Sequence, residues 1–128
     1  MGKLFIVEGP DRGRSFRIKG QTVFIGRSPA NDIQMRDKTI SRQHLKIVRK
    51  GDKYFVEDLQ SKNGTYVNGE QIRPGVEIEV NEGHPIVIGM SVICLGEGCL
   101  ELVKSYLDSL DVSETTKGFT GTETIVLK

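Results

Sequence analysis

Short apolar runs broken by turn residues dominate the first hundred residues of this chain. The run Leu4-Phe5-Ile6-Val7 comes first, and Phe16 and Ile18 then alternate with polar neighbours. Turn-forming pairs such as Asn63-Gly64 and Glu82-Gly83 separate later runs. Alternation with a period of two is the pattern of half-buried strands. Roughly ten or eleven runs, spaced about 8–12 residues apart, predict an antiparallel β-sandwich and disfavour alternating strands and helices.

The pattern changes near residue 98. Apolar residues then recur at three- and four-residue spacing, as on an amphipathic helix, and they are Leu100, Val103, Leu107 and Leu110. We expect a short C-terminal helix over 99–111 that packs back on the sandwich, with binding to a partner as the alternative. Residues 112–128 are polar and rich in threonine, which predicts a flexible tail. The chain is thus divided into a sandwich over 1–98, a helix and a tail.

Composition excludes several classes of protein. Of the 128 residues 37% are hydrophobic, enough for one packed domain. The formal net charge of +1 is too small for a general nucleic-acid or membrane surface. No apolar run approaches the about 18 residues of a membrane span, and no apolar signal segment opens the chain. Two cysteines, Cys94 and Cys99, are too few for a disulfide framework, so we expect single buried thiols in a cytoplasmic protein.

Four polar clusters fall at the expected loops. They are Gly26-Arg27, Ser41-Arg42-Gln43-His44, Asn63-Gly64-Thr65 and Asn68-Gly69. Together they supply a guanidinium, hydroxyl and amide donors, and glycines that allow close backbone approach, which is the chemistry that holds a phosphate. Each cluster also has a simpler explanation, because loop arginines are usually solvated and Asn-Gly is a common hairpin turn.

No catalytic or metal-binding pattern accompanies these clusters. Ser41 and His44 lack a Gly-x-Ser-x-Gly elbow and an acid partner, so we expect no hydrolase and assign His44 to loop structure. Residues 9–15 are one residue short of a P-loop and contain no lysine. The two cysteines and two histidines include no Cys-x-x-Cys pair, which disfavours zinc. We therefore expect a protein that binds rather than catalyses, without cofactor or metal.

Taken together, the clusters and their spacing closely resemble the forkhead-associated (FHA) family of phosphothreonine-binding domains. The matching stretches are residues 24–28, 39–45 and 58–69, and the resemblance spans about residues 3–98. It implies an all-β fold, an eleven-stranded antiparallel β-sandwich with the binding loops at one end. It also implies a preference for phosphothreonine over phosphoserine, and selectivity set by the residue three positions after the phosphothreonine.

The resemblance assigns a role to each matching residue. The phosphate-binding residues would be Arg27, Ser41 and Arg42. The peptide-binding residues would be Lys62 and Asn63. The loop-shaping residues would be Gly26, His44 and Gly64. The implied partner is a phosphothreonine-bearing protein of a Ser/Thr kinase pathway, with no nucleic acid or membrane as ligand. A structural β-sandwich that mediates phosphorylation-independent interactions is the alternative.

The tail contains candidate phosphorylation sites of its own, namely Thr115, Thr116, Thr122 and Thr124. Thr122 and Thr124 each precede an aliphatic residue by three positions, a spacing that several FHA domains favour. Residues 111–121 can extend over about 36–40 Å, whereas a sandwich strand is about 20 Å long. A phosphorylated tail can therefore reach the binding loops of its own domain or of a neighbour. An inert linker is the simpler explanation of the same composition.

Overall fold

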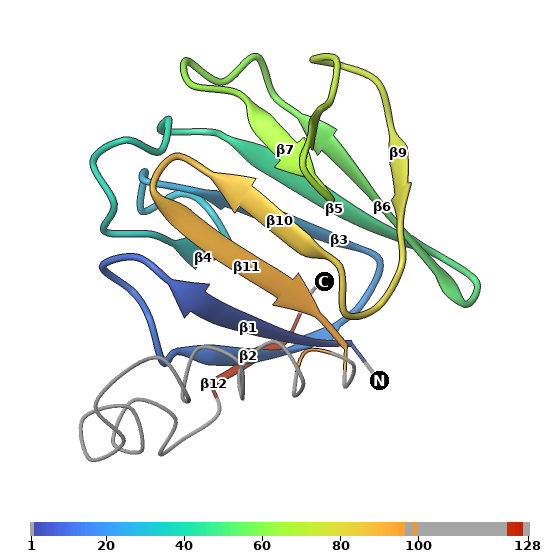
Figure 1. Ribbon diagram of the computed structural model, residues 1–128. Helices are drawn as coiled ribbons and strands as arrows, with labels where there is room; N and C mark the ends of the chain where they lie inside the picture. The colour runs from blue at the N-terminus through green and yellow to red at the C-terminus, as the bar shows by residue number, and fades with distance from the viewer. Residues whose placement is uncertain (1, 97–98, 100–122, 127–128) are drawn as a thin grey trace.

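The computed structural model describes residues 2–96, Cys99 and the backbone of 123–126. The strands in chain order are β1 (Lys3–Glu8), β2 (Ser15–Lys19), β3 (Thr22–Gly26), β4 (Ile33–Gln34), β5 (Leu45–Lys50), β6 (Lys53–Asp58), β7 (Thr65–Val67), β8 (Glu70–Gln71), β9 (Ile78–Val80), β10 (Pro85–Ile88), β11 (Ser91–Leu95) and β12 (Glu123–Val126). One sheet has the order β12-β2-β1-β11-β10-β7-β8 and the other β4-β3-β5-β6-β9 (Figure 1). All pairs are antiparallel except β12 with β2 and β3 with β4. The predicted all-β sandwich is confirmed, with eleven described strands before residue 96.

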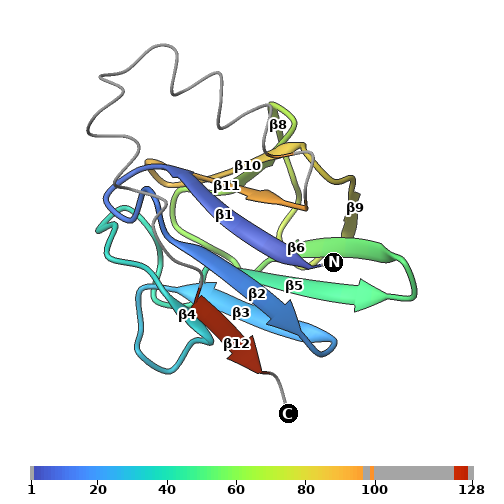
Figure 2. The ribbon, with the colours of Figure 1, turned by 90° about the horizontal axis from the view of Figure 1, so that it is seen from below.

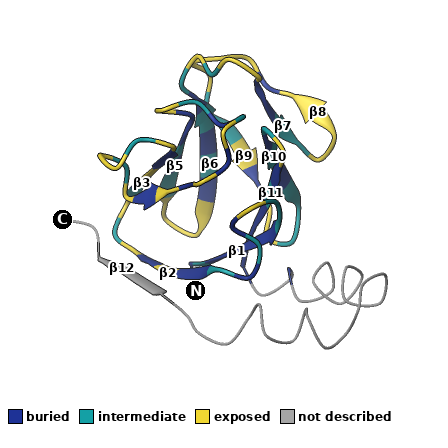
Figure 3. Cartoon of the chain, turned by 90° about the vertical axis from the view of Figure 1, so that its left-hand side faces the viewer, coloured by how far each residue is buried: buried dark blue, intermediate teal, exposed yellow. Residues whose placement is uncertain are grey.

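The core lies between the two sheets, and its residues follow the period of two that the sequence predicts. On β1 and β11 the register pairs Leu4 with Leu95 and Ile6 with Ile93, and all four side chains are buried. The opposite sheet contributes a matching layer, which includes Ile25, Leu45, Ile47 and Val56. Exposed residues concentrate in the loops and on β8 (Figure 3). Burial of both layers is what fixes the register of the strands.

A second, smaller apolar cluster contains Phe5, Val7, Cys94 and Cys99. Cys94 and Cys99 form a disulfide with their Cα atoms 5.8 Å apart, so the prediction of two single thiols is wrong. The cause is a local turn after β11. Gly96 has a φ of 87°, and its carbonyl accepts a 3.2 Å hydrogen bond from the Cys99 N–H. This turn brings the chain back toward Cys94, which spacing alone does not indicate.

The predictions of a helix and a flexible tail after residue 98 have different outcomes. The predicted helix over 99–111 lies outside the described residues apart from its first residue, as do the candidate phosphorylation sites before residue 123. Residues 123–126 depart from the predicted flexible tail, because they form β12 parallel to β2, with Glu123 opposite Phe16 (Figure 2). The run Thr124-Ile125-Val126 is β-branched and favours a strand. Its partner β2 would otherwise be a sheet edge with unpaired backbone groups.

Three loops emerge together at one end of the sandwich. β3 runs antiparallel to β5, which in turn runs antiparallel to β6, so residues 27–32, 35–44 and 59–64 lie at the same end. The β5–β6 hairpin lies at the opposite end (Figure 1). Within the described part of the chain, no helix is long and apolar enough to cross a membrane.

Candidate functional site

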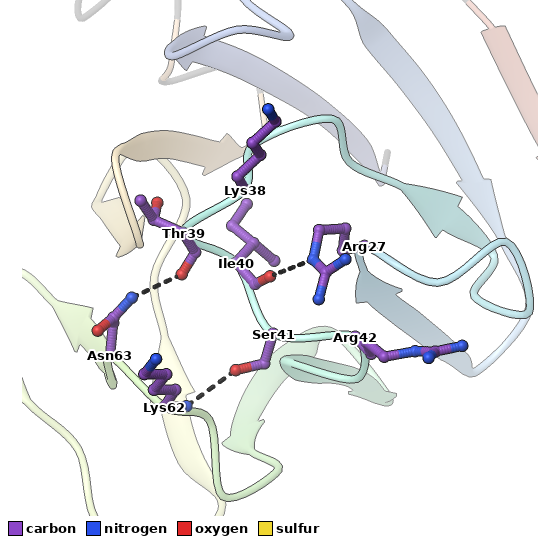
Figure 4. A pocket seen from close by; sticks show the side chains of 8 residues that line it. All are labelled: Arg27, Lys38, Thr39, Ile40, Ser41, Arg42, Lys62 and Asn63. Carbon is purple, nitrogen blue, oxygen red and sulfur yellow. Dashed lines mark hydrogen bonds between the residues drawn. The ribbon is translucent and has the colours of Figure 1, made fainter.

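A pocket of about 420 Å³ opens between the three loops. Its lining residues are Arg27, Lys38, Thr39, Ile40, Ser41, Arg42, Lys62 and Asn63 (Figure 4). All five predicted binding residues are in this set, although they come from three separate stretches of sequence. Arg27 and Arg42 lie on one side of the backbone at Ser41, and Lys62 and Asn63 lie on the other (Figure 4).

Arg27 is held in place by the loop that faces it. Its backbone N–H donates to the carbonyl of Ser41 at 3.0 Å, and its Nε donates to the carbonyl of Ile40 at 3.2 Å. The terminal guanidinium nitrogens have no hydrogen-bond acceptor among the described residues. A guanidinium anchored through Nε keeps two parallel donors for an oxyanion, which is the geometry of bidentate phosphate binding.

The Ser41 hydroxyl is positioned by the neighbouring loop. Its Oγ accepts a 2.8 Å hydrogen bond from the Lys62 backbone N–H, so its own proton remains available to donate to an anion. The Ser41 N–H donates to His44 Nδ1 at 3.0 Å, while His44 Nε2 lies 2.9 Å from the carbonyl oxygen of Gly64. Both ring nitrogens are thus occupied by backbone, and the imidazole contacts no serine hydroxyl. Ser41 has no general base, so this pair is not a nucleophilic dyad.

His44 is fully buried and acts as a spacer between two loops. Burial lowers the pKa of its imidazole below the usual 6.5, although the Gly64 carbonyl and the charge of Asp58 act in the opposite direction. A Nδ1 atom that accepts from an N–H requires the neutral ring with its proton on Nε2. The neutral ring is therefore the form that the loop geometry needs.

A buried carboxylate supports the loop that carries Asn63. Asp58 accepts hydrogen bonds from the Ser61 N–H at 3.0 Å, from the Ser61 hydroxyl and from the Thr65 hydroxyl at 2.6 Å. Burial alone would raise the pKa of Asp58, but these hydrogen bonds outweigh it and hold the pKa below the ordinary value. Asp58 is therefore an ionised anchor for the 59–64 loop.

A second buried carboxylate, Asp37, joins the pocket to the turn between β10 and β11. It accepts from the Thr39 N–H at 2.8 Å, from the Met90 N–H at 3.0 Å and from the Ser91 hydroxyl at 2.8 Å. Burial raises the pKa of Asp37, and the hydrogen bonds from Thr39 and Ser91 lower it by more. Thr39 then offers its carbonyl to Asn63 Nδ2 at 2.8 Å. Asn63 thus bridges two loops from an exposed position.

Sequence reasoning missed Asp37, Asp58 and Lys38 as parts of this site. Asp37 stands two residues before Thr39, and Asp58 three before Ser61. These are the offsets at which an aspartate accepts from nearby backbone, so the signal was present. Lys38 carries no local signal, because a loop lysine is usually solvated surface.

Two of the glycines in these loops stand where a side chain would be strained or would clash. A Cβ at Gly26 would collide with the carbonyl of Arg42 and lie 2.8 Å from Asn31 Nδ2. Asn31 uses that same Nδ2 to donate to the Arg42 carbonyl at 2.7 Å. Gly64 has a φ of 83°, which a β-carbon disfavours. The Asn68-Gly69 pair, with φ of 51° and 86°, forms the β7–β8 turn and does not line the pocket.

The pocket is strongly cationic. Its four positive side chains, Arg27, Lys38, Arg42 and Lys62, form no ion pair with any carboxylate of the described residues. In the described part of the chain, no three His, Cys, Asp or Glu side chains gather as metal ligands would. The pocket therefore gathers unpaired positive charge and hydrogen-bond donors, a chemistry that suits an oxyanion, on loops that buried side chains hold in place.

Fold and pocket together define a class of protein: a β-sandwich with a cationic pocket between the loops at one end. Residues 23–89 match the family model of the FHA domain, and the chain belongs to this family. The family predicted from the sequence is therefore confirmed.

Individual relatives agree with this assignment. An oxoglutarate dehydrogenase inhibitor from Corynebacterium jeikeium is 41% identical over 86 residues, which cover 67% of this chain and 58% of that protein. The chain spans about three-fifths of the length of the curated relatives that it matches. The FHA domain of CT664 from Chlamydia trachomatis superposes with a TM-score of 0.69 at 30% identity, covering 76% of this chain and 98% of that one. EmbR from Mycobacterium tuberculosis, solved in complex with a low affinity phosphopeptide, has a TM-score of 0.64 at 29% identity, covering 74% of this chain and 24% of that one.

Proposed function

We propose that this chain is a signalling module that binds phosphothreonine-containing proteins through the pocket between its end loops. The observation that carries the proposal is the Arg27 guanidinium, which is anchored on the Ile40 carbonyl and keeps its terminal nitrogens unpaired in a pocket that Ser41 also lines. A phosphothreonine carries a charge of about −1.5 to −2 at pH 7 and three acceptor oxygens. The phosphopeptide in the EmbR complex supports the same chemistry for this fold.

Each of the five predicted binding residues has a place in this proposal. Arg27 and Ser41 hold the phosphate, and Arg42 adds charge beside them. Asn63 donates through Nδ2 to Thr39, which leaves its Oδ1 to accept an N–H of the peptide main chain. Lys62 borders the peptide next to Asn63. The module itself does no chemistry, because Ser41 lacks a base.

The proposed partner is a phosphoprotein produced by a Ser/Thr kinase, and the proposed compartment is the cytoplasm. Neither nucleic acid nor membrane is a proposed ligand, because the net charge of the chain is only +1. A structural sandwich whose interactions ignore phosphorylation is the competing function, and one titration separates the two.

That titration compares a phosphothreonine peptide with its unmodified form by calorimetry. We expect binding of the phosphorylated peptide alone. Arg27→Ala should cost about 2–5 kcal/mol of binding free energy, the range for truncating one partner of a hydrogen-bonded charge pair. Lys53→Gln removes one positive charge from the β5–β6 hairpin at the opposite end and serves as the matched control. Equal affinity for both peptides, or an Arg27→Ala protein that binds normally, rules the proposal out.

We further propose that the phosphorylated tail of the chain competes for the pocket. β2 begins at the end of the sandwich where β3 delivers Arg27, and Glu123 pairs opposite Phe16 near the start of β2. β12 therefore starts at the same end as the pocket. A tethered ligand has an effective concentration of about millimolar, enough to compete with a modest external affinity.

The tail proposal is tested with chain phosphorylated on Thr122. External phosphopeptide should bind more weakly to this protein than to the unmodified chain. Truncation after Asp111 should restore the affinity. An unchanged affinity after phosphorylation dismisses regulation by the tail and leaves phosphopeptide binding untouched.

A further inference from the structure

We infer that the pocket selects phosphothreonine peptides that carry a second negative group next to the phosphate, either an acidic side chain or another phosphate. This inference rests on the proposed function, since it narrows the ligand of the same pocket. It follows from the number of positive charges around the pocket and from how each of them is held.

The charges in the pocket exceed what one phosphate neutralises. Four cationic side chains line it, against a ligand charge of at most about −2. No carboxylate is among the lining residues. The nearby carboxylate of Asp37 is buried and already accepts hydrogen bonds from Thr39, Met90 and Ser91. A singly phosphorylated peptide without acidic residues therefore leaves about two positive charges without a partner.

Three lysines that do not line the pocket are paired with glutamates. Lys46 lies 3.4 Å from Glu57, and Lys53 lies 3.6 Å from Glu79. Lys50 likewise pairs with Glu77 at 2.5 Å. These pairs lie on the β5, β6 and β9 surface, away from the pocket. The four cations of the pocket have no such carboxylate partner among the described residues.

The four cations are also held differently from one another. Arg27 alone donates from its side chain to the loop, through Nε to Ile40, and so is already oriented for the phosphate. Lys38, Arg42 and Lys62 are exposed, and no hydrogen bond or ion pair holds their charged groups within the described residues. Lys38 stands at one end of the segment through Ser41, and Arg42 and Lys62 stand near the other (Figure 4).

This placement suits a charge one or two residues from the phosphothreonine. An extended peptide advances about 3.3 Å per residue, so such a group lies about 3–7 Å along the chain from the phosphothreonine. That distance is within the screening length of about 8 Å at physiological salt, so the unpaired cations attract the group without a fixed contact. The chain contains a sequence of this kind, Thr122-Glu123-Thr124.

The experiment uses three synthetic peptides that copy residues 118–128, all phosphorylated on Thr122, titrated into the full unmodified chain. The first carries Glu123→Gln, the second is native, and the third is also phosphorylated on Thr124. Each added exposed charge pair is worth about a 1.4- to 5-fold change in affinity, and the third peptide has two more negative groups than the first, so we expect it to bind about 2- to 25-fold tighter. The difference should shrink as salt is raised from 0.05 to 0.5 M.

Substitutions of single cations in the pocket show which of them cause the preference for a second negative group. Lys38→Gln and Arg42→Gln should each lower the affinity ratio between the third and first peptides, whereas the control Lys53→Gln should leave that ratio unchanged. Equal affinities for all three peptides overturn this inference while phosphothreonine binding stands. No binding by any of them also overturns this inference, while the titration that compares a phosphothreonine peptide with its unmodified form decides the proposed function separately. If the affinity still increases from the first peptide to the third in the Arg27→Ala variant, the cations form a general polyanion surface and the inference is overturned. The same conclusion follows if inorganic tripolyphosphate abolishes the binding of all three peptides equally.

Discussion

The Nε2 atom of His44 lies 2.9 Å from the carbonyl oxygen of Gly64, while Nδ1 of the same ring accepts the N–H of Ser41. One buried imidazole therefore joins the loop that carries the serine to the loop that carries Asn63. The arrangement needs a neutral ring, because a protonated Nδ1 would point a hydrogen at the Ser41 N–H. The geometry of the pocket is thus linked to the protonation state of a residue that does not line it.

We expect the free energy of unfolding to fall as pH drops below about 6.5. Burial holds the pKa of folded His44 below 6.5, so in the window beneath that value the unfolded chain binds more protons than the folded one. Stability then rises with pH, with a slope of at most about 1.4 kcal/mol per pH unit for one proton. Urea unfolding between pH 7.5 and 5 measures this slope.

Two features make this pH test specific. Asp37 and Asp58 have pKa values below their ordinary 3.8, so the stability they contribute is present above pH 3.8 and is lost only as pH falls below it. The variant His44→Gln lacks the titrating ring and should show a smaller slope. Identical slopes in the two proteins would show that another group causes the pH dependence.

Gly26→Ala should disturb the pocket through backbone contact. The added methyl group meets the carbonyl of Arg42, which belongs to the main chain and cannot rotate away. We expect a loss of about 1–3 kcal/mol in unfolding free energy, as for other overpacked sites, and weaker phosphopeptide binding.

The matched control for Gly26→Ala is Gly51→Ala, on the distant β5–β6 hairpin. Gly51 has a φ of 62° and nothing within 4 Å of an added Cβ, so the change strains only the backbone, by about 1–2 kcal/mol. Its phosphopeptide affinity should equal that of the unaltered protein. If both glycine variants bind equally well, the contact between Gly26 and Arg42 does not position the pocket.

The Asn63 side chain is predicted to hold the peptide main chain, and Asn63→Ala tests this directly. The variant removes both the bond to the Thr39 carbonyl and the acceptor offered to the peptide. We expect phosphopeptide affinity to fall by about 1–3 kcal/mol, as for a polar group left without its partner. Calorimetry with one phosphothreonine peptide gives this value.

Asn68→Ala is the control for Asn63→Ala, because it changes the same residue type at the β7–β8 turn. Asn68 has a φ of 51°, so this variant should lose stability through backbone strain while it keeps its phosphopeptide affinity. An Asn63→Ala protein that binds as well as Asn68→Ala would remove Asn63 from the binding site.

Much of this domain is predictable from its sequence because the signals are local and repeated. Alternation around Phe16 and Ile18, with glycine turns between runs, is enough to predict the sandwich. The spacing of the polar clusters then predicts which loops meet, and the structure brings Arg27, Ser41 and Asn63 to one pocket.

What the sequence does not reveal depends on contacts between distant segments. The pairing of β12 with β2 joins residues more than a hundred positions apart, and a polar, threonine-rich composition masks the short β-branched run. Asp37 reaches Ser91 across 54 positions. The disulfide depends on a glycine turn whose conformation the residue type permits but does not require.

Reduction of the Cys94–Cys99 disulfide should lower stability and leave binding unchanged. The bond closes a loop with a sequence separation of five residues, for which restriction of the unfolded chain gives about 2 kcal/mol. Cys94 and Cys99 lie beyond the middle of β11, whereas Ser91 at its start holds Asp37 behind the pocket. The pocket and the disulfide are therefore at opposite ends of one strand.

Comparison of oxidised and reduced protein of the same sequence tests this without substitutions. Urea unfolding should show a lower midpoint after reduction, and titration with a phosphothreonine peptide should give affinities within about twofold of each other, a difference below about 0.4 kcal/mol. Thiol titration in denaturant provides the control, with no free thiol before reduction and both after it. Equal stability of the two forms would mean that the disulfide adds no stability to the folded protein. A large loss of affinity would instead show that the far end of β11 helps to hold Asp37 in place.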